Sequence, residues 1–362
     1  NPVSNSFYFA SALAFDNESK LWVADTLNNR VIRFDPPFTM LDQSAAVKLG
    51  QPSYDTRYMN WDGVNNVDNT TVAYPNGLYE PGGVAFSTAG SLYVSDSSNN
   101  RVLRWDNPIS DSTPANAVFG QMDFYGMAPN RGAALPGPET LNHPNGLAID
   151  RNGKIYIADT YNNRVLRLSS SFSPDGVCGQ PDFTRAETNR LDGASIAEPV
   201  DVAFDYNYTP PRLYVLDRSN NRILGWESLD DALAGNTADV VLGQPDLYSR
   251  LSGCSQTLMS YPEAVAVDKD STVWVADSSN SRVIGFQNPW TNDNTADYLI
   301  GQDSWFTNLP NKGLPQPDEK TLSFPGAVFC PSGSSDIWIA DTDNNRVLLF
   351  PNTGTFPLSA TV

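Results

Sequence analysis

Residues 21–34 read LWVADTLNNRVIRF, and close copies of this stretch recur along the whole chain. The copies are LYVSDSSNNRVLRW at 92–105, IYIADTYNNRVLRL at 155–168, LYVLDRSNNRILGW at 213–226, VWVADSSNSRVIGF at 273–286 and IWIADTDNNRVLLF at 337–350. Each copy begins with a nearly continuous apolar run, which is typical of a β-strand covered on both faces. A second apolar run follows the polar Asp-x-x-Asn-Asn-Arg segment. Each copy therefore predicts two strands joined by a short turn, and six units fill the 362 residues.

Two further strands flank each copy. A short apolar run with small residues precedes it, as at Gly146–Asp150, and another follows it, as at Ala45–Leu49. After five of the units comes the pair Gly-Gln, and then a long polar loop that ends in a proline. Four short antiparallel strands repeated six times predict an all-β fold, a six-bladed β-propeller with four antiparallel strands per blade. Small residues on the first strand and aromatics on the second fit blades that diverge from an axis.

We expect a single domain over residues 1–362, with blades at about 1–50, 82–120, 145–179, 200–243, 263–301 and 325–362. Each blade is expected to take its four strands from one continuous segment. The last blade would reach its fourth strand at 355–362, and the ring would close by side-chain packing of the last blade on the first.

The turn between the second and third strands carries the same polar residues in every unit. An Asp can accept backbone N–H bonds in an Asx-type turn, and an Asn tolerates left-handed backbone angles. The Arg can pair with that Asp or with a nearby carbonyl. Because a catalytic site needs one exceptional copy, six equal copies indicate a structural turn. Its residues are Asp25, Arg30, Asp96, Arg101, Asp159, Arg164, Asp217, Arg222, Asp277, Arg282, Asp341 and Arg346.

These cores resemble the NHL-repeat family of β-propellers, with Ala replaced by Ser95 and Leu216 and one Asn by Ser281. The resemblance extends over the whole chain and implies a six-bladed ring, but it implies no single function. The units exceed the usual repeat by loops of the type found at Gly179–Phe183. A lyase of the family binds its metal through histidines, whereas this chain has only His143, a loop residue beside a proline. We therefore predict neither a metal site nor catalytic residues.

Charge and composition exclude several partners. The chain has 41 acidic and 23 basic side chains, a net charge of −18, which argues against nucleic acid and anionic membranes. It contains no apolar run long enough to span a bilayer. We expect no cofactor. Calcium is the alternative, but the segment Asp268-Lys269-Asp270 is too short for a calcium loop.

Cysteines and glycosylation sequons bear on the compartment. Cys178 and Cys254 should lie on one face in neighbouring units, so they are the pair that a disulfide would join, with Cys330 a free buried thiol. Asn17, Asn69 and Asn207 begin Asn-x-Ser/Thr sequons in exposed connections, and unmodified asparagine is the alternative to glycosylation. The chain begins without Met, as a mature or trimmed form would. We predict an extracellular or secreted protein.

The longest interblade loop, Gln51–Pro81, is the candidate binding loop. Alternating strand directions place the interblade loops and the turns on the same face. The loop is rich in aromatic residues, which are good contact groups: Tyr54, Tyr58, Trp61, Tyr74 and Tyr79. Our hypothesis is a recognition or scaffolding module with protein or glycan partners or self-assembly, within an extracellular structural assembly. The alternative is a hydrolase or lyase with a site at the channel mouth, which would need unique ionisable residues there.

Overall fold

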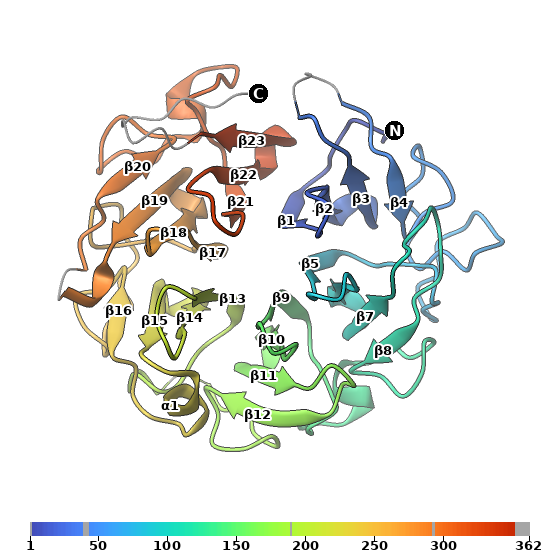
Figure 1. The fold of residues 1–362 in the computed structure, drawn as a ribbon, viewed down its shortest axis with the longest axis horizontal. Helices are drawn as coiled ribbons and strands as arrows, with labels where there is room; N and C mark the ends of the chain where they lie inside the picture. The colour runs from blue at the N-terminus through green and yellow to red at the C-terminus, as the bar shows by residue number, and fades with distance from the viewer. Residues whose placement is uncertain (1, 39–42, 189, 292–293, 352–362) are drawn as a thin grey trace. The chain divides into compact units, whose positions relative to one another are not determined.

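The computed structural model describes residues 2–38, 43–188, 190–291 and 294–351 (Figure 1). Almost all of the regular structure in these ranges is β-sheet. Residue contacts divide the chain into two compact units. The first comprises residues 1–162, 166–176 and 182–186, and the second comprises residues 163–165, 177–181 and 187–362.

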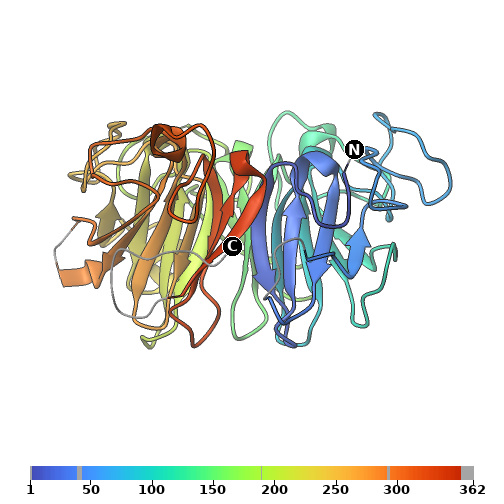
Figure 2. The ribbon, with the colours of Figure 1, turned by 90° about the horizontal axis from the view of Figure 1, so that it is seen from above.

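The first unit holds two complete sheets and most of a third. The first sheet contains β1 (Ala10–Phe15), β2 (Leu21–Asp25), β3 (Arg30–Phe34) and β4 (Val47–Leu49). The second contains β5 (Pro81–Phe86), β6 (Leu92–Asp96), β7 (Arg101–Trp105) and β8 (Ala117–Phe119). The third contains β9 (Pro144–Ile149), β10 (Ile155–Asp159), β11 (Arg164–Leu168) and β12 (Pro174–Cys178). In Figure 2 the strands β1 to β3 are seen along their length, with hairpins and turns at their two ends.

The second unit holds the other three sheets. The fourth sheet contains β13 (Pro199–Asp205), β14 (Arg212–Asp217), β15 (Arg222–Trp226) and β16 (Val240–Leu242). The fifth contains β17 (Ala264–Val267), β18 (Thr272–Asp277), β19 (Arg282–Gln287) and β20 (Tyr298–Ile300). The sixth contains β21 (Pro325–Phe329), β22 (Ile337–Asp341) and β23 (Arg346–Phe350), and its predicted fourth strand at 355–362 lies outside the described residues.

Helical structure is confined to short segments. The one α-helix in the described ranges is α1 (Leu229–Leu233). The repeat turns are 3₁₀ segments: η1 (Thr26–Asn28), η2 (Ser97–Asn99), η4 (Thr160–Asn162), η5 (Arg218–Asn220), η6 (Ser278–Asn280) and η9 (Thr342–Asn344). Three more lie in connections: η3 (Pro129–Gly132), η7 (Pro289–Thr291) and η8 (Pro310–Gly313).

The fold class predicted from the sequence, an all-β six-bladed β-propeller, is confirmed. Every sheet comes from one continuous segment, its strands hydrogen-bond in chain order, and the paired strands run antiparallel. The prolines expected ahead of the first strands are instead their first residues at four places, as at Pro81, which lies opposite Asp96. A proline is tolerated at a strand end because its missing N–H removes no interior ladder bond.

Apolar packing follows the predicted gradient of side-chain size. Every residue of β2, β6 and β10 is buried. The first strands of neighbouring blades pack side by side within each unit, and they leave little room. A Cβ on Gly83 would lie 2.3 Å from the carbonyl oxygen of Asn145 in the next blade. Aromatics of the second strands, such as Trp22 and Tyr214, are almost fully buried in the two cores.

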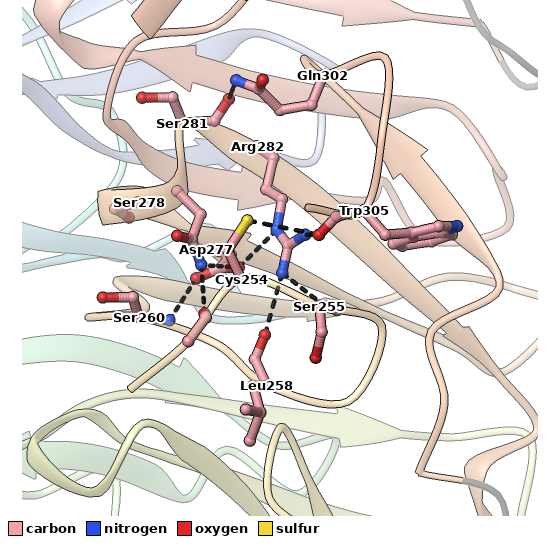
Figure 3. A network of polar contacts seen from close by, with 12 residues as sticks. Cys254, Ser255, Leu258, Ser260, Asp277, Ser278, Ser281, Arg282, Gln302 and Trp305 are labelled. Atoms are coloured by element: carbon pink, nitrogen blue, oxygen red, sulfur yellow. Dashed lines mark hydrogen bonds and ion pairs between the residues drawn. The ribbon is translucent and has the colours of Figure 1, made fainter. Parts of the chain in front are cut away.

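The Asp and Arg of each repeat form a buried ion pair that fastens the interblade loops, as Figure 3 shows for the fifth blade. Arg282 Nε donates to Asp277 Oδ2 at 2.7 Å. The Nη atoms of Arg282 donate to main-chain carbonyls in two different loops: Trp305 at 2.9 Å, Ser255 at 2.8 Å and Leu258 at 3.0 Å. Asp277 Oδ1 accepts from Ser260 N at 2.7 Å. One ion pair therefore holds the loop that enters the blade and the loop that leaves it.

The predicted Asx-type turn is wrong, but the predicted left-handed asparagine is confirmed. Asp25 caps no turn N–H. Its Oδ1 accepts from Tyr8 N at 2.6 Å, in the segment that enters the blade, while Arg30 occupies its Oδ2. The turn closes instead on a left-handed residue, as at Asn29 with φ 51°. The same conformation occurs in the other repeats, at Asn100, Asn163, Asn221, Ser281 and Asn345.

The Gly-Gln pair after the fourth strand completes this arrangement. Gln51 Nε2 donates to the carbonyls of Asn29 at 2.9 Å and Tyr58 at 2.7 Å, and its Oε1 accepts from Tyr58 N at 2.7 Å. Gly50 has φ 93°, and a Cβ there would lie 2.7 Å from the Asn29 carbonyl oxygen. The loop can therefore pass close to the turn only with glycine at this position.

We predict that replacing Arg101 by Met lowers the free energy of unfolding by about 3 to 5 kcal/mol, because it leaves a buried carboxylate without its partner. Burial already raises the pKa of Asp96, and the Arg101 guanidinium opposes that rise. Urea denaturation measures the change. The matched control is Arg185→Met, at a half-exposed arginine 3.7 Å from Asp182, for which we expect less than about 0.5 kcal/mol. Equal losses in the two variants would contradict the structural role of the motif.

Candidate functional site

The Gln51–Glu80 loop joins β4 to β5. Three of the five aromatic residues predicted to contact a partner have intramolecular packing contacts instead. Trp61 is 8% exposed. Tyr54 lies under the Lys48 ammonium group at 5.0 Å, and its carbonyl accepts from Arg30 at 2.6 Å. Tyr74 packs edge-on against Tyr125 at 5.9 Å. These three predicted contact residues therefore stabilise the loop.

Tyr58 and Tyr79, the other two, line a cavity of about 520 Å³ that lies within the first unit. The remaining lining residues come from the same loop and from the β2–β3 turn: Leu27, Asn29, Asp55, Thr56, Arg57, Met59, Asp68 and Glu80. A cavity of this size accommodates a small molecule or one to two side chains of a partner. We therefore take this loop cavity as the candidate functional site.

Repeat-motif residues of two blades fix the walls of the loop cavity. Asn29 donates from Nδ2 to the Arg57 carbonyl at 3.0 Å and accepts at Oδ1 from Glu80 N at 2.9 Å. Tyr79 N donates to Asp96 Oδ1 at 2.7 Å. The Gln51 side chain hydrogen-bonds to both the main-chain N–H and the main-chain carbonyl of Tyr58. The cavity is therefore preorganised by the same contacts that stabilise the fold.

The charged groups of the loop cavity are mostly carboxylates. Asp68 Oδ1 accepts from Met59 N at 2.9 Å, and Glu80 Oε2 accepts from the Ser98 hydroxyl at 2.6 Å. The Ser53 hydroxyl donates to Asp55 and lowers the pKa of that carboxyl. With Arg57, the lining carries three acidic groups and one basic group. The described ranges contain no group of three or more His, Cys, Asp and Glu side chains placed to hold a metal ion.

A second candidate site lies between the fourth and fifth blades, within the second unit, where two residues depart from the repeat pattern. In the other turns the residue after the motif Asp is Ser or Thr. At Thr26, Ser97 and Ser278 its hydroxyl donates to the carbonyl of the proline that opens the next blade, as from Ser97 to Pro144 at 2.6 Å. The fourth blade has Arg218 instead. Its guanidinium lies 3.2 Å from Glu198 and 3.3 Å from Glu263, and 4.8 Å from the Tyr261 ring.

A second departure from the repeat, at Asp201, occurs at the same blade boundary as Arg218. The other first strands carry Gly or Ala at this place, whereas Asp201 Oδ2 accepts from Val265 N of the next blade at 2.9 Å and Oδ1 accepts from Val202 N. Asp201 as a whole residue is half-buried, and its carboxyl group is the part that is shielded from solvent. Burial raises the pKa of Asp201 to about 7, and Glu263 adds to the rise. The site therefore holds a carboxyl that titrates near neutrality.

The other residues considered from the sequence have structural surroundings. His143 stacks on Tyr161 with ring centroids 4.7 Å apart. Asp268, in the segment weighed for calcium, accepts from Asp270 N and Thr272 N at 2.9 Å and from Trp274 Nε1 at 3.0 Å, as expected of a hairpin residue. Asp159 and Arg164 of the third repeat are fully buried.

The predicted disulfide between Cys178 and Cys254 is not formed, and both are free cysteines, as is Cys330. Cys178 is buried at the end of β12. The Cys254 thiol is turned toward the following loop and donates to the carbonyls of Trp305 at 3.4 Å and Thr307 at 3.2 Å (Figure 3). The two thiols therefore belong to different local packing environments.

The three sequons differ in accessibility. Asn17 and Asn207 are exposed in hairpins between first and second strands. Asn69 is half-buried in the long loop, where its Oδ1 accepts from Val72 N at 3.0 Å and its Nδ2 donates to the Tyr74 hydroxyl at 3.3 Å.

The sequence analysis missed several residues of both sites. Arg57, Asp68 and Glu80 of the loop cavity carry no distinguishing pattern, because they are polar residues in a polar loop. Arg218 and Asp201 did leave a signal. Each occupies a position at which the other repeats have a small residue, and aligning the six units residue by residue would have found them.

Known proteins share the repeat and the fold. The NHL repeat, as a sequence family, matches residues 78–105, 141–168 and 259–286. Protein SUPPRESSOR OF QUENCHING 1, chloroplastic, of Arabidopsis thaliana is 32% identical over 167 residues, which are 46% of this chain and only 14% of that protein.

Two solved structures are similar at low identity. A catalytically inactive histidine-to-alanine variant of virginiamycin B lyase from Staphylococcus aureus has a TM-score of 0.53 and 12% identity, covering 99% of this chain and 86% of that one. A gluconolactonase from Xanthomonas campestris has a TM-score of 0.55 and 15% identity, covering 99% and 89%. At these identities the similarity shows the fold alone.

We predict that Asp201→Asn removes part of the pH dependence of stability. Because the folded pKa of Asp201 is about 7 and the ordinary value is 3.8, the folded state binds the extra proton between these values. Wild-type stability therefore falls as the pH rises through this window. From pH 5 to pH 8 the variant should gain on the order of 2 kcal/mol relative to wild type in urea denaturation. The control Asp182→Asn, at an exposed carboxyl, should not gain; a parallel gain there would refute the assignment.

Proposed function

We propose that this NHL-repeat β-propeller is a recognition module that binds its partner in the loop cavity. The observation that carries the proposal is a preformed cavity of about 520 Å³ whose walls are fixed by Asn29, Gln51 and Asp96 of the repeat framework. A rigid scaffold that holds a long, aromatic, polar loop open is the usual arrangement for binding. Such a site gains affinity because little ordering remains to be done when the partner binds.

Burial of the repeated polar residues supports recognition over turnover. The Asp and Arg side chains of the first two repeats are fully buried and bonded to each other and to loop carbonyls. They are not accessible to a substrate. The lyase with the similar fold has a variant, described as catalytically inactive, in which one histidine is replaced. The single histidine here, His143, is stacked on Tyr161.

A hydrolase or lyase is the second candidate, and one observation favours it. Asp201 has a pKa of about 7 beside Glu263, and groups of this kind act as general acids and bases. The test is turnover: Asp201→Asn would abolish hydrolysis of a simple lactone if this candidate were correct. Absence of turnover by the wild-type chain, together with partner binding, supports recognition.

We propose further that the module works outside the cell as part of a larger assembly. Asn17 and Asn207 offer exposed sequons on hairpins. The Nδ2 atom of each donates to the hairpin of the neighbouring blade, from Asn17 to the Thr88 carbonyl at 3.0 Å and from Asn207 to the Ser271 hydroxyl at 3.0 Å, and a glycan would replace these bonds. The exposed acidic surface implied by a net charge of −18 suits a solvated carrier of a binding loop. In the described part of the chain, no helix is long and apolar enough to cross a membrane.

The recognition proposal predicts the effect of two aromatic substitutions. A ligand found by screening glycan and peptide arrays should bind the double variant Tyr58→Ser/Tyr79→Ser about tenfold or more weakly than wild type, because both rings line the loop cavity. The matched control is Tyr248→Ser, at a tyrosine that is 68% exposed in another interblade loop. Equal affinity of wild type and double variant would reject the loop cavity as the binding site.

The location proposal predicts glycosylation. Expression through the secretory pathway of a eukaryotic host should yield a protein whose mass falls on treatment with an N-glycosidase. Peptide mapping should place glycans at Asn17 and Asn207, because both side chains are exposed. Asn17→Gln/Asn207→Gln should lose most of that shift. Secretion of an unmodified protein would remove the support that the sequons give.

A further inference from the structure

Building on the proposed function, we infer that the loop cavity binds a cationic nitrogen group, an alkylammonium or a guanidinium. The inference names the chemical class of the ligand, whereas the proposed function requires only that something binds there. It comes from the charges, the hydrogen-bond acceptors and the aromatic rings that line the cavity.

Charge selects a cation. The lining contains the carboxylates of Asp55, Asp68 and Glu80 against the single guanidinium of Arg57, so its formal charge is −2. The Ser53 hydroxyl holds the pKa of Asp55 below its usual range, which keeps that carboxylate ionised. The net charge of −18 on the whole chain raises the local concentration of cations and repels anions.

Hydrogen bonding selects a donor. One oxygen of each carboxylate is already used, by Ser53, Met59 N and Ser98. Asp55 and Asp68 are exposed and Glu80 is half-buried, so the other oxygen of each carboxylate can exchange water for a donor of the ligand. These other oxygens are Asp55 Oδ2, Asp68 Oδ2 and Glu80 Oε1. A carboxylate can only accept. An ammonium group offers three donors and a guanidinium five, whereas an ionised carboxylate offers none.

Aromatic walls complete the match. Tyr58 and Tyr79 line the same space, and the face of an aromatic ring attracts a cation within about 6 Å of its centre. Met59 and Leu27 add apolar surface for the methylene stem that an alkylammonium carries. A neutral sugar would also stack on tyrosine, but it would leave the charge of the site uncompensated.

A cationic nitrogen can come from a free polyamine or from a Lys or Arg side chain of a protein partner. Isothermal titration calorimetry distinguishes these sources with two probes, spermidine and a tetralysine peptide. Cellobiose serves as the neutral probe and N-acetylglutamate as the anionic one. We expect the wild-type chain to bind at least one cationic probe and neither of the others, with an affinity that falls as salt is added.

The decisive variant is Asp68→Asn/Glu80→Gln, which removes two charges and keeps the shape of the cavity. Binding of the cationic probe should weaken by about tenfold or more. The matched control is Asp182→Asn/Asp246→Asn, which removes the same charge from exposed carboxyls of two other interblade loops. The control should bind within about twofold of wild type, because distant surface charges are screened. Thermal unfolding of each variant verifies that it is folded.

The outcomes separate this inference from the proposed function. Equal weakening in both charge variants would mean attraction to the whole surface and would overturn the cationic site. Binding of cellobiose that the Tyr58→Ser/Tyr79→Ser variant abolishes would overturn the cation class and leave recognition through the loop cavity intact. Failure of every probe to bind wild type would overturn the cation inference, while an array ligand sensitive to the tyrosine substitutions would still support the proposed function.

Discussion

The buried ion pair between the motif Asp and Arg is the interaction on which the rest of each blade depends. Asp277 and Arg282 lie at facing ends of β18 and β19, where they pair at 2.7 Å and are fully buried. Removing two charges from water is costly, so the pair persists only because main-chain groups satisfy what remains. Ser260 N meets the free carboxylate oxygen, and carbonyls of two loops meet the guanidinium. The ion pair therefore holds the loops in place, and the main-chain groups of the loops in turn make the burial of the ion pair possible.

This dependence explains how long polar loops can present a defined surface. Hydrogen bonds from Arg30, from the left-handed Asn29 and from Gln51 anchor the Gln51–Glu80 loop. The loop therefore keeps a defined conformation without a large hydrophobic core within it. The loop cavity forms where the anchored segments leave space beside Tyr58 and Tyr79. Binding and stability therefore share residues: Asn29 both anchors the loop and lines the cavity, whereas the side chains of Tyr58 and Tyr79 line the cavity without anchoring the loop.

The boundary between the fourth and fifth blades shows what happens when the repeat departs from its rule. At three boundaries within the units, a hydroxyl donates to the proline carbonyl of the next blade, at Thr26, Ser97 and Ser278, and at one of them Gly83 lies close to the next blade. Here Arg218 and Asp201 replace small residues. Arg218 pairs with Glu263 of the next blade, and Asp201 accepts from Val265 N of that same blade. The result is a blade contact that depends on protonation, because Asp201 has a pKa of about 7.

The fold class, the strand order and the structural role of the turn motif could be predicted from the residues alone, because strand periodicity and a repeated motif can be read directly along the chain. The sequence also located the long aromatic loop. That Tyr58 and Tyr79 line a cavity while Trp61 is buried could not be predicted in this way, since a polar loop has no periodicity from which side-chain direction can be read. The position of the Cys254 thiol and the grouping of Arg218 with Glu198 and Glu263 likewise depend on contacts between residues 20 to 53 positions apart. Side-chain direction across such distances is set by packing, not by sequence spacing.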